Sequence, residues 1–164
     1  LFARRKESLS YTTSKYTAIL DSDDVWSDKS KLTEQVDFLE QSTDHVLVGT
    51  RTTLIDVNGN EIGRSAFSTD DSNIRSKILA RNQFTHSSLL ILTEALSKTS
   101  GYEPTLAEDL EIILQLGKIG KIGNLPGYYT AHRVHTGSQN DHGIKMALAV
   151  KNIVEKIESE IKKA

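Results

Sequence analysis

Three aspartates stand within four residues of one another, at Asp21, Asp23 and Asp24. Carboxylates this close repel one another and cost stability unless something neutralises them. A divalent cation is the natural partner, because carboxylate oxygens are hard ligands. An EF-hand is excluded, since Val25 occupies a ligand position and the loop glycine and final glutamate are absent. The cluster therefore indicates a cation site or, as is commoner for an isolated Asp-x-Asp, a solvated acidic turn.

A second acidic pair, Glu108-Asp109, stands near the start of an expected helix whose apolar positions include Leu106 and Leu110. Acids in a first helical turn are favoured by the helix dipole alone. A carboxylate can also act as a general base when it lies beside a reacting hydroxyl. Taken by itself the pair favours the structural explanation, so its context along the chain must decide.

A short apolar run, Tyr16 to Leu20, precedes the first acidic cluster. A run of this kind that ends abruptly in acids is typical of a buried parallel strand. We therefore expect Ile19 and Leu20 on a central strand. Asp21 to Asp24 would then lie just past its carboxyl end, where ligands bind in open α/β sheets.

Strand and helix signals alternate along the rest of the chain. Ser27 is expected to cap a helix with Leu32, Val36 and Leu39 on one face. Further strands are expected at 46–55, around 62, at 88–92 and at 128–134, and further helices around 74–79, from 93, over 106–114 and over about 141–163. The pattern predicts one α/β domain spanning 1–164, with a mixed, largely parallel sheet flanked by helices.

Composition narrows the class of protein. The 164 residues carry a net charge of −2 with both signs interspersed, so there is no basic footprint for nucleic acid. The absence of cysteine excludes disulfides, zinc–thiolate sites and thiol catalysis, and suits a cytoplasmic location. No apolar run reaches membrane-spanning length. The first residues are no natural initiation sequence and the only methionine is Met146, so we expect the chain to begin inside a longer reading frame.

Several motifs, in order along the chain, resemble the inverting family 2 glycosyltransferases of the GT-A fold. The run YTAILDSDDVW from Tyr16, with Lys31-Leu32 after it, is similar to the family's strand, Asp-x-Asp, aromatic residue and helix start. The later matches are NQFTHSS from Asn82, Gly101-Tyr102-Glu103, Glu108-Asp109, and Arg133-Val134-His135 with Ser138. Ordered matches over about residues 3–138 are far more specific than any single motif.

The resemblance implies a role for each candidate residue. Asp23 would coordinate Mn²⁺ or Mg²⁺ bridging the two phosphates of the donor. His135 would contact the metal or the diphosphate, with a purely structural or exposed histidine as the equal alternative. Asp109 would be the general base that deprotonates the acceptor hydroxyl. The donor side would also include Asp21, Asp24 and Trp26, and the acceptor side would include His86 and Glu108.

The chain also departs from the family pattern. Arg5 replaces an asparagine, Ser100 replaces a glycine, and three residues separate Tyr129 from Arg133. In the family, the strands that hold the nucleotide base come before the strand that carries the Asp-x-Asp motif. We expect the corresponding strands to be encoded upstream of Leu1. We therefore expect this chain to be the C-terminal part of a catalytic domain, weakly active or inactive alone, whose parent is cytoplasmic or associated with a membrane.

The expected function is a metal-dependent inverting transfer from a nucleotide-sugar, expected to be UDP-linked, to a saccharide or other hydroxyl acceptor. The alternative is a non-catalytic glycosyltransferase-like binding or interaction module, or an inactive fragment. An unrelated α/β phosphotransferase is disfavoured because no phosphate-binding loop is present. The C-terminal helix interleaves lysines with acids, so we expect it to pack on a protein partner or a second copy rather than on a membrane.

Overall fold

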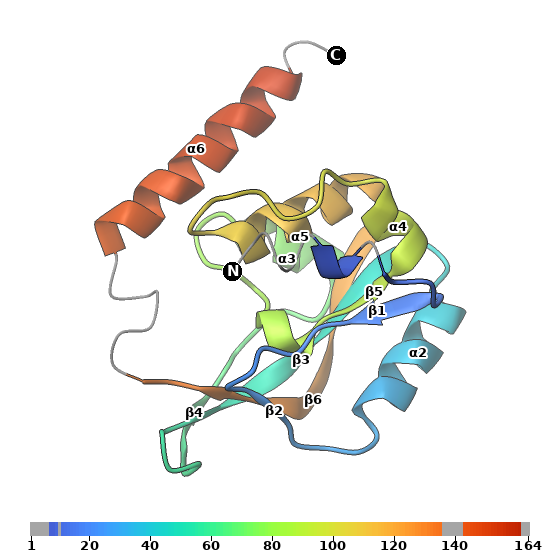
Figure 1. Cartoon of the computed structure of the whole chain (residues 1–164), viewed down its shortest axis with the longest axis vertical. Helices are drawn as coiled ribbons and strands as arrows, with labels where there is room; N and C mark the ends of the chain where they lie inside the picture. The colour runs from blue at the N-terminus through green and yellow to red at the C-terminus, as the bar shows by residue number, and fades with distance from the viewer. Residues whose placement is uncertain (1–6, 10, 136–142, 162–164) are drawn as a thin grey trace.

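A mixed sheet runs through the middle of the molecule, with helices on both faces (Figure 1). The computed structural model describes residues 7–9, 11–135 and 143–161. The strands are β1 (Tyr16–Ala18), β2 (Val25–Trp26), β3 (His45–Ile55), β4 (Glu61–Arg64), β5 (Leu90–Leu92) and β6 (Lys121–Arg133). The helices are α2 (Lys31–Gln41), α3 (Asp71–Lys77), the 3₁₀ turn η1 (His86–Ser88), α4 (Thr93–Ser97), α5 (Glu108–Ile119) and α6 (Gly143–Ile161).

The two faces of the sheet bury separate apolar clusters, because successive side chains of a strand point to opposite faces. In β3 the fully buried Leu47 packs in the larger cluster with residues of α3, α4 and α5. Its neighbour Val48, also fully buried, packs in a smaller cluster with Leu39 of α2 and Leu90. The strand is thus buried on both sides, as its nearly continuous apolar start indicates.

Strand direction differs from the sequence-based expectation. The described strands are ordered β1-β5-β3-β6-β2, with β4 also paired to β3. The sheet is mixed as predicted, but among the described strands only β3 and β6 pair in parallel, so the expectation of a largely parallel sheet is wrong. An apolar run has the same pattern in either direction, because direction depends on which distant strand it meets.

The strand before the acidic cluster is also not central. β1 ends at Ala18 and lies at one edge of the described sheet, while Ile19 and Leu20 follow it. Leu20 is 48% exposed, so the predicted burial of this run is wrong at its end. The strand pairs only with β5, which supplies one hydrogen-bonding neighbour instead of two.

Most local signals are confirmed by the described elements. Gly59 adopts a φ of 90° in the turn between β3 and β4, a conformation that favours glycine. The predicted cap at Ser27 is wrong, because α2 begins at Lys31 with Ser30 at its N-cap position, and Asp28 accepts hydrogen bonds from the backbone and hydroxyl of Ser30, each 2.8 Å. The strand predicted at 128–134 begins already at Lys121, since its parallel pairing with β3 tolerates register shifts.

The C-terminal helix α6 packs on the larger core cluster through Ala149 and Ile153. Ile144 and Leu148 lie on its exposed side, at 82% and 53% exposure. The predicted packing of this helix on a partner or a second copy stays a prediction. Among the described residues, none of the helices combines the length and apolar character that crossing a bilayer requires.

Candidate active site

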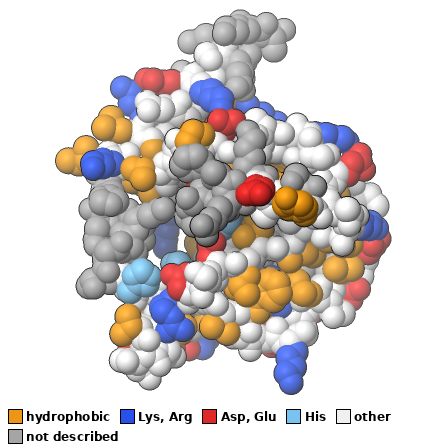
Figure 2. Space-filling model, in the orientation of Figure 1, with side chains coloured by type: hydrophobic (Ala, Val, Ile, Leu, Met, Phe, Trp, Pro, Cys, Tyr) orange, Lys and Arg blue, Asp and Glu red, His pale blue; other side chains and the backbone are white. Residues whose placement is uncertain are grey.

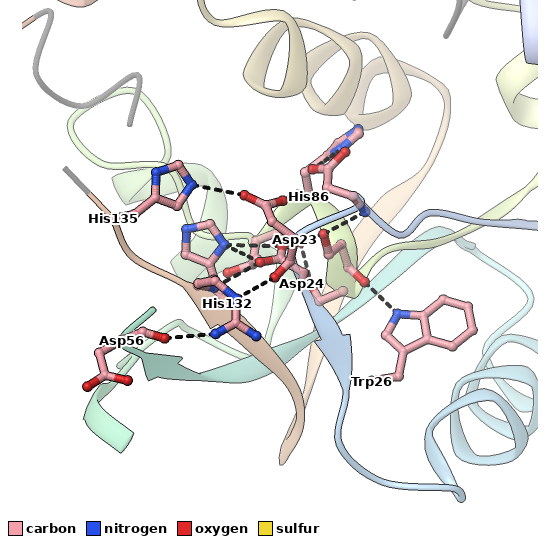
Figure 3. A network of polar contacts seen from close by, with 12 residues as sticks. Asp23, Asp24, Trp26, Asp56, His86, His132 and His135 are labelled. Atoms are coloured by element: carbon pink, nitrogen blue, oxygen red, sulfur yellow. Dashed lines mark hydrogen bonds and ion pairs between the residues drawn. The ribbon is translucent and has the colours of Figure 1, made fainter. Parts of the chain in front are cut away.

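Each carboxylate of the acidic cluster faces its own histidine (Figure 3). The cluster forms a tight turn after β1, closed by a 3.2 Å hydrogen bond from the Asp24 backbone N–H to the Asp21 carbonyl. The pairs are Asp21 with His86 at 3.1 Å, Asp23 with His135 at 3.1 Å, and Asp24 with His132 at 2.9 Å. In the orientation of Figure 1, histidine and acidic side chains are seen side by side on the surface (Figure 2). The repulsion among the acids is therefore offset within the protein itself.

Asp24 is the buried member of the cluster, with a side chain 2% exposed. Its carboxylate accepts hydrogen bonds from the Ser87 hydroxyl, from Nδ1 of His132 and from the backbone N–H of Arg133. Burial alone would raise the pKa of Asp24, but these hydrogen bonds outweigh it and hold the pKa below its ordinary value. Asp24 thus ties the acidic turn to η1 and to the end of β6.

The partner histidine responds in the opposite direction. The hydrogen bond to Asp24 raises the pKa of His132, although partial burial acts to lower it. With Asp24 ionised, Nδ1 must carry the proton of the bond, because a carboxylate can only accept.

This pair predicts a specific dependence of stability on pH. The lowered pKa of Asp24 contributes stability above the unfolded value of about 3.9, which is lost as pH falls through the folded value. The raised pKa of His132 contributes stability below its unfolded value of about 6.5, which is lost as pH rises through the folded value. The pair should therefore stabilise most between about pH 4 and 6.5.

Urea denaturation between pH 5 and 9 measures how the free energy of unfolding depends on pH. His132→Gln should flatten the fall in unfolding free energy above pH 6. The matched control His135→Gln should keep most of that fall, because its ion pair with Asp23 is exposed on both sides. An unchanged slope in His132→Gln would contradict the assignment.

Asp23 and His135 are the pair best placed to hold a cation. Their side chains are 47% and 41% exposed, and Oδ2 of Asp23 lies 3.1 Å from Nε2 of His135. Carboxylate oxygen and imidazole nitrogen both suit Mn²⁺. The described residues contain no group of three or more His, Cys, Asp or Glu side chains that could hold a metal ion. Phosphate and water oxygens can supply further ligands to such a pair. Such sharing is usual for magnesium-type ions bound with nucleotides.

Asp21 is held from a different direction. Nδ1 of the buried His86 lies 3.1 Å from its Oδ2, and Nε2 of His86 lies 2.8 Å from the Tyr102 hydroxyl. The Asp21 backbone N–H also donates to the Ser87 hydroxyl at 3.0 Å. His86, predicted on the acceptor side, therefore contacts a residue predicted on the donor side.

The second acidic pair opens α5, as the sequence predicts. Glu108 is buried, at 6% exposure, whereas Asp109 is only partly buried. Oδ2 of Asp109 accepts a 3.0 Å hydrogen bond from the amide of Asn82. Asn82 and His86 are four residues apart, which limits their separation to about 14 Å. The segment between them thus touches both acidic groups.

Trp26 lies apart from the other candidates. Its indole N–H donates to the Ser87 carbonyl at 2.8 Å, and its ring covers the buried Lys31 ammonium at 4.4 Å. Figure 3 shows the ring directed toward α2, away from His132 and His135. These contacts explain its packing, and its predicted contact with the donor stays a prediction.

Four residues of this network had no assigned role in the sequence-based site: His132, Ser87, Tyr102 and Asn82. Three of them lie inside segments that match family motifs, NQFTHSS and Gly101-Tyr102-Glu103, so the motif itself was the available signal. His132 lies in the three-residue segment that departs from the family pattern, and no sequence signal marks it. Arg133 donates hydrogen bonds to the backbone carbonyls of Asp23 and Asp56, and it thereby connects the acidic turn to the residue that follows β3.

Comparison with known proteins now places the chain in a class. Residues 1–103 match the family described as glycosyl transferase family 2. The chain belongs to glycosyl transferase family 2, as its motifs indicate. A comparison with curated proteins gives no match.

A solved structure shows the same fold. The chain is similar to a mannosyltransferase from Pyrobaculum calidifontis, solved in complex with GDP-Man and Mn²⁺, with a TM-score of 0.64 and 14% identity. The match covers 97% of this chain and 44% of the mannosyltransferase, so the chain spans less than half of that protein's length. The predicted GT-A fold class, a mixed sheet flanked by helices, is confirmed.

Proposed function

We propose that the protein transfers a sugar from a nucleotide-sugar to an acceptor hydroxyl, with inversion at the anomeric carbon and with a requirement for Mn²⁺ or Mg²⁺. The observation that carries the proposal is the exposed Asp23–His135 pair on the acidic turn of a family 2 chain. The mannosyltransferase of the same fold supports it, since that protein was solved with a nucleotide-sugar and Mn²⁺.

The exposure and the hydrogen bonds of each residue in the acidic turn suggest a different role for it. Asp23 and His135 would hold the cation, which when bound supplies positive charge against the departing diphosphate. Asp21 would contact the donor from the side of His86. Asp24 would stabilise the turn, because its carboxylate oxygens already accept hydrogen bonds from protein donors. That occupancy supports a positioning role for Asp24 rather than direct contact with the donor.

The acceptor would be activated by Asp109. Its partly buried carboxylate accepts a hydrogen bond from Asn82, which fixes one oxygen. The second oxygen would take the proton of the acceptor hydroxyl as that hydroxyl attacks the anomeric carbon. Glu108 is less suited to this role because it is 6% exposed.

The nucleotide of the donor is a finer part of the proposal. The sequence resemblance favours a UDP-linked sugar, whereas the mannosyltransferase was solved with GDP-Man. UDP and GDP carry the same diphosphate, so the described contacts of Asp21 and Asp23 suit both nucleotides. Both nucleotides belong in the test.

Thermal unfolding tests the proposal. Mn²⁺ together with UDP or GDP should raise the melting temperature more than the metal or nucleotide alone, because the two share one site. A ligand at 100 times its Kd stabilises by about 2.7 kcal/mol, which corresponds to roughly 5–10 °C for a chain of this size. Mg²⁺ is tested alongside Mn²⁺.

The control is Asp37→Asn, an exposed aspartate of α2, which should respond as the wild type does. Nucleotide binding that ignores the metal would count against the cation site. Binding without any sugar transfer would favour the alternative, a non-catalytic glycosyltransferase-like binding module.

A further inference from the structure

A chain of hydrogen bonds links the donor side of the site to the turn that precedes α5. The Tyr102 hydroxyl lies 2.8 Å from Nε2 of His86, and Nδ1 of His86 lies 3.1 Å from Oδ2 of Asp21. Tyr102 and His86 are 3% and 8% exposed, so water competes little for these bonds. The two rings also meet edge to face, with centroids 5.6 Å apart.

The chemistry of the three side chains fixes which of them donates the proton in each hydrogen bond. An ionised Asp21 can only accept, so Nδ1 of His86 must carry the proton that it shares with Asp21. In the tautomer with its proton on Nδ1 alone, Nε2 is an acceptor and the Tyr102 hydroxyl donates to it. Each proton thus points toward the Asp21 carboxylate, whose side chain is 29% exposed.

The position of Tyr102 connects the two halves of the site. It follows Gly101, which has a positive φ of 74°, and it precedes α5, which begins with Glu108 and Asp109. Tyr102 is part of the larger core cluster, so its hydroxyl is fixed by packing. The orientation of Asp21 therefore depends on a residue anchored beside the helix that carries the candidate base.

We propose that His86 and Tyr102 are positioning residues, which hold the Asp21 carboxylate in one orientation and thereby set the affinity for the diphosphate of the donor. This inference rests on the proposed function. Hydrogen bonds to charged groups contribute about 10-fold or more to such equilibria, more than bonds between neutral groups. Loss of the His86–Asp21 bond should therefore matter more than loss of the Tyr102–His86 bond.

Two substitutions of His86 separate the two bonds. In His86→Asn the amide nitrogen stands as many bonds from the backbone as Nδ1, so it can still donate to Asp21. In His86→Gln the amide group stands as far from the backbone as Nε2, so it can hydrogen-bond with Tyr102 but not with Asp21. Both variants lose the ring, so the cost of lost packing is common to them. We expect His86→Gln to weaken Mn²⁺-dependent binding of UDP or GDP about 10-fold, and His86→Asn to stay within about 3-fold of the wild type.

Calorimetry with UDP and GDP in the presence of Mn²⁺ measures these affinities. Equal losses in the two variants would overturn the proposal, because they would reflect packing alone. Tyr102→Phe should weaken binding by about 2- to 5-fold, since one neutral donor is removed.

Nitrogen NMR of the ¹⁵N-histidine-labelled chain gives a readout that does not depend on activity. Nδ1 of His86 should carry a proton, and Tyr102→Phe should shift the Nε2 signal. An unprotonated Nδ1, with the ring proton on Nε2 alone, would overturn the proposal. If the wild type binds neither nucleotide, the proposed function fails. The tautomer of His86 still shows whether His86 donates to Asp21 as proposed.

Discussion

Asp109→Asn is expected to lower the turnover of sugar transfer by about 10²- to 10⁴-fold, the usual contribution of a general base. Folding should be nearly unchanged, because the new amide is almost isosteric and its oxygen can still accept from Asn82. The lost charge at the start of α5 costs only about 0.3–1 kcal/mol of helix stabilisation. Donor affinity should stay close to that of the wild type, since Asp109 lies outside the acidic turn.

The measurement is kcat on a form of the protein that transfers sugar, together with the donor Kd from calorimetry. Asp37→Asn is the matched control, because it makes the same change at an exposed position of α2. Glu108→Gln tests the neighbouring acid. Full turnover in Asp109→Asn would show that the base is Glu108 or another carboxylate.

Asp23→Asn is expected to impair both donor binding and turnover. The substitution removes the one anionic partner of His135 in the candidate cation site. Even the loss of an outer-shell partner typically costs about 10- to 100-fold in metal affinity, so loss of a ligand should cost at least as much. Stability should change little, because the side chains of Asp23 and His135 are both more than 40% exposed.

Calorimetry of UDP and GDP with Mn²⁺, and again with a chelator, measures this effect. The wild type should lose affinity when the metal is removed, and Asp23→Asn should bind weakly under both conditions. The two aspartate variants therefore separate binding from chemistry: Asp109→Asn affects only turnover, whereas Asp23→Asn affects both. Unchanged, metal-dependent affinity in Asp23→Asn would remove Asp23 from the cation site.

The elements that the sequence predicts well are those whose signals are local. The turn at Asn58-Gly59 follows from the positive φ that glycine tolerates, and α5 begins at Glu108 where acids favour a helix start. Strand β3 was recognisable from its apolar start, which is buried on both faces. Each of these signals acts over a few neighbouring residues, so one sequence contains all of it.

The direction and place of the strands were not local properties. β1 was expected at the centre of a largely parallel sheet, yet it lies at an edge of the described sheet and pairs antiparallel with β5. Its partner comes from 72 to 76 residues away, as the register Ala18 to Leu90 and Tyr16 to Leu92 shows. Periodicity within a strand carries no information about which distant strand will be its neighbour.

By itself the sequence determined the family, the α/β class and the set of acids that could bind a cation or accept a proton. Only the tertiary structure decided which of these acids is exposed and which is buried, and which partner each one has. Asp23 and Asp24 are adjacent and chemically identical, yet one is 47% exposed beside His135 and the other is 2% exposed beneath His132. Their partners lie 112 and 108 residues away along the chain. The roles of neighbouring carboxylates depend on burial and hydrogen bonding, and packing between distant segments creates both.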